Sequence, residues 1–212
     1  MTSLALLVLR ATVGSLLAGH GGQKLFGWFG GRGFTATTSW MESMGLRPGH
    51  RWAGLAGLSE FGGGVLTALG FLSPVGPLMS MGAMLMATFK AHAGKPIWGT
   101  AGGAELPLTN IAVQTALVAT GPGAISLDRL LGIRLPRWVS IVGLGAVVAG
   151  VWYGLRQSQP GTVALADDAA EAEFVAEVDH LAELDAGIGE DDLHAELEVE
   201  GPAIAAMRRE LP

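Results

Sequence analysis

The chain has 212 residues, of which half are hydrophobic and only 15% are charged, with 33 glycines and no cysteine. This composition is unusual for a soluble domain and typical of a polytopic membrane protein, and the lack of cysteine excludes disulfides and Cys-ligated metals. Residues 1–159 carry 11 Lys or Arg and 4 Asp or Glu, whereas residues 160–212 carry 2 and 15. The charges therefore divide the chain into a basic membrane body and an acidic tail.

Five hydrophobic stretches are predicted to cross the membrane as helices, since about 20 apolar residues span a bilayer. In chain order they are Leu4–Gly22, Trp52–Leu72, Val75–Phe89, Leu106–Thr120 and Trp138–Leu155. The first contains Arg10 and lacks a basic n-region and a cleavage site, so we expect it to be retained rather than removed as a signal peptide. The short turn at Pro74 makes the second and third stretches an antiparallel hairpin.

The segment 23–51, between the first two stretches, is too polar to cross the membrane. Phe34, Trp40, Met41 and Met44 fall on roughly one helical face, which predicts a short helix lying at the membrane interface. An ordered surface loop is compatible with the same residues. Most of the Lys and Arg residues lie on the side of this segment, and the positive-inside rule assigns that side, with the tail, to the cytoplasm.

Three regions are expected: a four-helix membrane domain over 1–135, an additional transmembrane helix over 136–157, and an acidic tail over 158–212. The charge density of the tail predicts a segment that is largely disordered or partly helical. An amphipathic helix in the tail that recruits a soluble or membrane protein partner is the alternative. The bilayer is the partner that the composition requires, a homo-oligomer is left open, and nucleic acid is not expected.

Glu60 lies about a third of the way into the second stretch, at a depth where an unpaired carboxylate is costly and marks a candidate site. Arg10, in the first stretch, is its predicted partner. Helical rise places Asn110 and Gln114 of the fourth stretch at a similar depth. These residues predict a buried polar pocket centred on Glu60 and Arg10. The alternative is structural: an ion pair that sets helix register, and amides that hydrogen-bond between helices.

Two histidines, His20 and His92, end the first and third stretches on the same side of the membrane and join the candidate pocket. Histidines at matching depth on two helices are an arrangement typical of axial haem ligands. Haem is nevertheless disfavoured, because an unliganded histidine is stable at the interface. No metal site is expected, and no catalytic residue is assigned.

Four motifs together resemble the DoxX family. They are GHGGQKLFG at Gly19–Gly27, LSEFGGGVLTALGF at Leu58–Phe71, a Met-rich third stretch that ends at a histidine, and GPGAISLD at Gly121–Asp128. The resemblance covers about residues 4–131 and implies a compact four-helix membrane bundle, without the fifth stretch and the tail. The positions that match are Arg10, His20, Lys24, Glu60, Ser126 and Asp128. Lys24 thereby joins the candidate pocket.

The last of these motifs also has a structural interpretation from its residue types. Gly121 and Gly123 around Pro122 can end a helix sharply, and Ser126 or Asp128 can cap the helix that follows. The motif is therefore expected to close the fourth helix rather than to bind a ligand.

Relatives in the DoxX family include the DoxD-type subunits of thiosulfate:quinone oxidoreductase. The resemblance therefore implies a subunit or accessory module of a membrane-associated redox system linked to sulfur or quinone. Its polar pocket would hold a small polar or quinone-like ligand or relay a proton, and whether the chain is itself an enzyme is left open. The expected location is the cell (plasma) membrane, with several crossings and a cytoplasmic tail.

Two other functional classes are compatible with the same residues. The first is a non-enzymatic membrane scaffold whose acidic tail recruits a soluble partner. The second is a small-molecule transporter, which is disfavoured because the chain has no recognisable inverted repeat.

Overall fold

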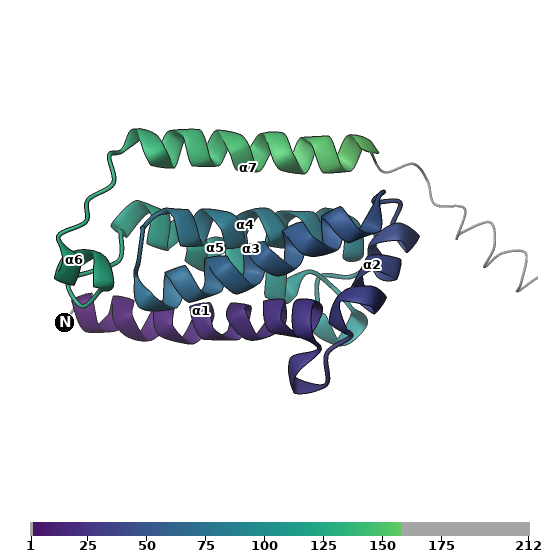
Figure 1. Cartoon of the computed structure of the whole chain (residues 1–212), viewed down its shortest axis with the longest axis horizontal. Coiled ribbons are helices and arrows are strands. Elements are labelled where there is room, and N and C mark those ends of the chain that lie inside the picture. Colours follow the sequence, from purple (N-terminus) through teal and green to yellow (C-terminus); the bar gives the residue numbers. More distant parts are fainter. Residues whose placement is uncertain (1, 158–212) are drawn as a thin grey trace, which may run out of the picture. The chain divides into compact units, whose positions relative to one another are not determined.

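A computed structural model describes residues 2–157, and all regular structure in this part of the chain is helical. The α-helices are α1 (Thr2–Phe26), α2 (Gly33–Ser43), α3 (Gly49–Leu69), α4 (Val75–Met86), α5 (Glu105–Thr120), α6 (Leu127–Leu131) and α7 (Trp138–Gln157) (Figure 1). Shorter turns are the 3-10 segments η1 (Trp28–Gly30) and η3 (Gly99–Ala101) and the π-helical turn η2 (Ala87–Ala91). The tail predicted over 158–212 lies outside the described residues.

The helical character of the five hydrophobic stretches is confirmed, since they coincide with α1, α3, α4, α5 and α7. Two glycines explain where these helices end. Gly70 follows α3 with a φ of 62°, and Gly121 follows α5 with a φ of 76°. Positive φ is the region that favours glycine, so the chain leaves the helix at these positions. The predicted closure of the fourth helix at Gly121 is confirmed.

Two of the described helices, α1 and α7, are long and apolar enough to cross a membrane by themselves. Large apolar side chains point outward along both of them, and each is more than half exposed: Leu4, Val8, Leu16, Ile141 and Val148. Outward-facing apolar side chains on helices whose backbone groups are paired internally are what a lipid environment requires.

Helices α1 and α3 approach so closely that their backbones are in contact. A Cβ atom added to Gly14 of α1 would lie 2.5–2.8 Å from backbone atoms of Gly64 and Ala68 of α3. A Cβ atom on Gly64 would likewise meet the backbone of Ala18 and Gly14. Small residues allow this van der Waals contact, which is the main attraction between helices in lipid. The contact fixes the two helices that carry Lys24 and Glu60.

Helix α4 is the centre of the remaining packing, because it contacts α3, α5 and α7. Figure 1 shows α7 running along α4 on the side away from α1. Small residues of α7 make this contact: Gly143 lies against Leu78, and Gly154 against Met86 and Trp52. Helix α7 therefore belongs to the same compact unit as α1–α5.

The segment 23–51 contains α2, so the prediction of a helix rather than a loop is confirmed. Figure 1 shows α2 at the end of the bundle where α1 ends and α3 begins. Met41 of α2 packs with Leu46 and Ala53 in a buried cluster. Other apolar residues pack against this cluster: Trp40, Met44, Trp52, Ala56 and Met86. The apolar face of α2 thus covers the start of α3.

Candidate functional site

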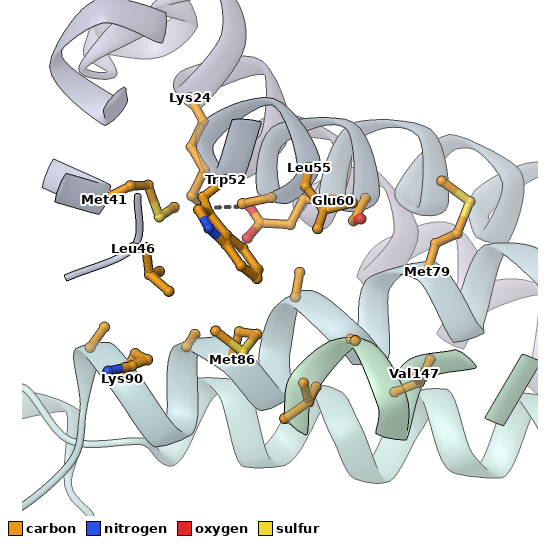
Figure 2. A pocket seen from close by; sticks show the side chains of 18 of the residues that line it. Lys24, Met41, Leu46, Trp52, Leu55, Glu60, Met79, Met86, Lys90 and Val147 are labelled. Atoms are coloured by element: carbon orange, nitrogen blue, oxygen red, sulfur yellow. Dashed lines mark hydrogen bonds and ion pairs between the residues drawn. The ribbon is translucent and has the colours of Figure 1, made fainter. Parts of the chain in front are cut away.

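A cavity of about 360 Å³ opens between α3, α4 and α7, with α2 and η2 at one end (Figure 2). Its volume lies in the range of small-molecule binding sites. Most of its walls are apolar and include the side chains of Trp40, Met41, Met44, Trp52, Met79 and Met86. On the α7 side, the lining consists largely of small residues: Gly143, Ala146 and Gly150. The walls therefore suit a flat, mainly apolar ligand.

An ion pair forms the polar part of the cavity wall. Glu60 of α3 accepts a hydrogen bond from the ammonium group of Lys24, which lies in the last turn of α1. The Glu60 side chain is 4% exposed and that of Lys24 is 24% exposed. A cation is favourable at the C-terminal end of a helix because of the helix dipole. Both side chains line the cavity, so the charges face any ligand inside it.

Trp52 crosses the cavity between its two long walls. Figure 2 shows its indole between the wall with Lys24 and Glu60 and the wall with Met86 and Lys90. The indole is also stacked on Tyr153 of α7, with the ring centroids 6.3 Å apart. This stacking holds a flat aromatic surface beside the ion pair.

Arg10 does not belong to this cavity. Its guanidinium donates hydrogen bonds to the backbone carbonyls of Ala68 and Ile125, and it lies against Gly70. Arg10 and Lys24 are 14 residues apart on α1, a separation of about 21 Å along the helix. The predicted pair of Arg10 with Glu60 is therefore wrong, because Glu60 pairs with the cation at the other end of α1.

Asp128 completes the polar group around Arg10. Its two carboxylate oxygens accept hydrogen bonds from the backbone N–H groups of Leu72 and Ser73, both at 2.8 Å. These donors lie in the turn between α3 and α4, so Asp128 ties this turn to the segment after α5. Ser126 caps α6 by accepting from the N–H of Arg129 at 3.3 Å, which confirms its predicted capping role.

The structure does not bring the two histidines and Asn110 into a common pocket. His20 is exposed, with a ring nitrogen 3.1 Å from the amide oxygen of Gln23. A ring nitrogen of His92 lies 2.6 Å from the carbonyl oxygen of Gly102. Asn110 donates to the carbonyl of Leu106 in its own helix at 3.0 Å. Each of these polar groups therefore has a contact away from Glu60, and none of them lines the cavity.

Gln114 is buried but lies outside the lining of the cavity. It is 0% exposed, and neither its amide nitrogen nor its amide oxygen has a partner among residues 2–157. Of the seven residues predicted to form one pocket, only Lys24 and Glu60 face the cavity, whereas Arg10 belongs to a separate cluster.

Sequence reasoning did not assign Trp52, Met86 and Lys90 to a site. One signal was available in the third hydrophobic stretch. Met79, Met86 and Lys90 are separated by seven and four residues, which places them on one side of a helix. The contribution of α7 could not be found this way, because spacing within one helix says nothing about which other helix lies opposite.

The comparisons with known proteins cover the helices that carry the ion pair. The family model described as DoxX matches residues 5–93. The chain is also similar to the inner membrane protein YqjF of Escherichia coli (strain K12), with 34% identity over 108 residues, which are 50% of this chain and 79% of that protein. No solved structure matches the chain. Lys24, Glu60 and Lys90 all lie within the residues that the family model matches.

Proposed function

Because this chain belongs to the DoxX family of membrane proteins, we propose that it is a quinone-binding subunit or accessory module of a membrane redox system. The observation that carries the proposal is the apolar cavity with the Lys24–Glu60 ion pair in its wall. Neither an apolar groove nor a buried ion pair alone would suggest this ligand. Together they match a molecule that has an apolar ring and tail and polar oxygens at one end.

In this proposal α1, α3, α4 with η2, and α5 form a four-helix transmembrane bundle, and α7 adds a fifth crossing. Figure 1 supports this path, since α1 and α7 both end, and α3 begins, at the end of the bundle where α2 lies. Basic residues are concentrated at that end and include Lys24, Arg47, Arg51, Lys90 and Arg156. By the positive-inside rule this end faces the cytoplasm of a plasma-membrane protein.

The residues of the cavity fit a quinone head group by their chemistry. The ammonium of Lys24 can donate a hydrogen bond to a carbonyl oxygen, and the Glu60 carboxylate can accept one from a hydroxyl. The Trp52 indole offers a flat face for ring stacking. Leu55 lines the cavity and is 56% exposed, so the wall reaches the outer surface of the bundle, where lipid would admit an apolar tail.

A bound quinone supplies redox chemistry that amino-acid side chains lack. The residues of this chain would hold the ring, orient its oxygens and exclude water. Glu60 would accept a proton from a hydroxyl of the reduced form, the quinol, and Lys24 would stabilise the carboxylate before that transfer. A partner protein of the redox system would donate electrons to the quinone or accept them from it.

The test is to fill the cavity without disturbing the packing of the protein. Gly150 lines the cavity, and a Cβ atom added there meets no atom within 4 Å. We expect Gly150→Leu to weaken binding of decylubiquinone at least about tenfold, since the new side chain occupies the space of the ring. Binding is measured by titration calorimetry of the protein in lipid nanodiscs, with empty nanodiscs subtracted.

Gly145→Leu is the matched control. It makes the same change in the same helix, also with no atom within 4 Å of the added Cβ, but outside the cavity lining. We expect it to bind decylubiquinone as the unsubstituted protein does. Absence of saturable binding in the unsubstituted protein, or equal binding by the two variants, would refute the proposal.

A second candidate function is a membrane scaffold, which the acidity of residues 160–212 favours. In that case a basic protein partner would be captured from membranes by the full chain and lost when these residues are deleted. Quinone binding would then be absent or insensitive to Gly150→Leu, so the two functions are separated by the same set of proteins.

A further inference from the structure

Lys90 lines the cavity but takes no part in the ion pair. It is half-buried, and its side chain has no hydrogen-bond or ion-pair partner within residues 2–157. Figure 2 shows it on the wall opposite Lys24 and Glu60, with Trp52 between the two walls. The Lys90 side chain therefore has its three N–H donors free of partners in the described part of the chain, so it is suited to bind an acceptor on a ligand in the cavity.

A π-helical turn places Lys90 on this wall. The residues of α4 and η2 that line the cavity recur in pairs every four residues: Leu78, Met79, Gly82, Ala83, Met86, Ala87, Lys90 and Ala91. In an α-helix a spacing of four residues drifts by about 40° per step around the axis, so the stripe would rotate away from the cavity. The wider turn of η2 rotates less per residue and offsets this drift at Lys90.

We infer that Lys90 is a second anchor for the ligand, so that the cavity selects a head group with two acceptor oxygens on opposite sides of one ring. The inference rests on the proposed function and specifies the ligand further. One oxygen would be bound from the Lys24–Glu60 wall and the other from the Lys90 wall, with the ring against Trp52. The two carbonyls of a 1,4-quinone have this arrangement.

A lipid with a single polar head would be a poorer ligand for this site. Its head group can reach only one of the two walls, so it leaves either Lys90 without an acceptor or the Lys24–Glu60 pair without a ligand. Rejection of a ligand that leaves a polar group of the site unpaired is stronger than rejection by shape alone. Fatty acids and phospholipids are therefore expected to compete weakly with a quinone.

The experiment measures hydrogen bonding at each of the two quinone carbonyls separately. Decylubiquinone carrying ¹³C at either C1 or C4 is bound to the protein in nanodiscs, and the carbonyl stretching bands are recorded by infrared difference spectroscopy. In the unsubstituted protein we expect both labelled bands at frequencies lowered by hydrogen bonding. In Lys90→Met one band returns to its frequency in lipid, the other is unchanged, and affinity falls about tenfold.

Two further variants control for charge and for folding. Lys90→Arg keeps a donor on the same wall and should restore the shifted band. Lys95→Met removes an exposed lysine that does not line the cavity and should leave both bands and the affinity unchanged.

The outcomes separate this inference from the proposed function. Quinone binding with both bands unaffected by Lys90→Met overturns the role of Lys90 and leaves the quinone site standing. Absence of quinone binding in the unsubstituted protein overturns both. Displacement of the quinone by oleate at equal concentration would also overturn the selection for two oxygens.

Discussion

The two ends of the helix bundle both bury charged side chains, but they use them differently. Around Arg10 and Asp128, the charged groups bind backbone atoms of neighbouring segments. The cavity beside Arg10 is about 10 Å³, enough for about one water molecule. Around Lys24 and Glu60, the charged groups bind each other and face a cavity of about 360 Å³. A buried charge in an apolar helix is therefore a structural clamp at one end and a candidate ligand site at the other.

The largest expected effect on stability comes from replacing Arg10, which binds two backbone carbonyls. Arg10→Met removes charge-assisted hydrogen bonds to two carbonyls and leaves both without that donor, so we expect a loss of about 3–5 kcal/mol in stability or failure to accumulate. Thermal unfolding in mild detergent measures it. Arg129→Met, an exposed arginine in the neighbouring α6, is the control and should change little. Equal stability of the two variants would contradict the assignment of Arg10 as a clamp.

At the other end of the bundle, substitutions of the two residues of the ion pair should have non-additive effects on stability. Lys24→Met and Glu60→Gln each leave the other residue of the pair without its partner. Because Lys24 is 24% exposed, we expect each substitution to lower the stability by about 1–3 kcal/mol. The double variant should recover much of this loss while quinone binding stays impaired, since neither Met nor Gln is charged and no buried charge is left without its partner. A double-mutant cycle on thermal stability measures the coupling. Additive losses would mean that the pair is not energetically coupled.

The smallest expected effect comes from the tail. Deleting residues 160–212 should change neither end of the bundle, since the clamp, the ion pair and the cavity lining all lie within residues 2–157. Unfolding temperature and decylubiquinone affinity of the truncated chain should match those of the full chain. A truncated protein that does not accumulate would show that the acidic segment contributes to the fold.

The positions of the helices could be predicted from the residue types alone. Apolar stretches of sufficient length predict helices in lipid because the backbone must pair internally, and the glycines around Pro122 predict the end of the fourth helix at Gly121. The second stretch was predicted to run to Leu72, whereas α3 ends before Gly70, whose φ is positive. The motifs shared with the DoxX family also include Lys24, Glu60, Arg10 and Asp128. The helices follow from local rules, which need no knowledge of which helices are neighbours, whereas Lys24 follows from the family resemblance alone.

Which charged side chains meet depends on how the helices pack against one another. Depth along a helix follows from residue number, but the direction of a side chain around the helix and the identity of the opposite helix do not. Arg10 and Lys24 lie on the same helix, and Arg10 is the partner that depth predicts for Glu60, but the packing of α1 on α3 through Gly14 and Gly64 brings Lys24 to it. The cavity likewise forms because α7, far away in sequence, packs over α4. A π-helical turn keeps Lys90 on the wall of this cavity.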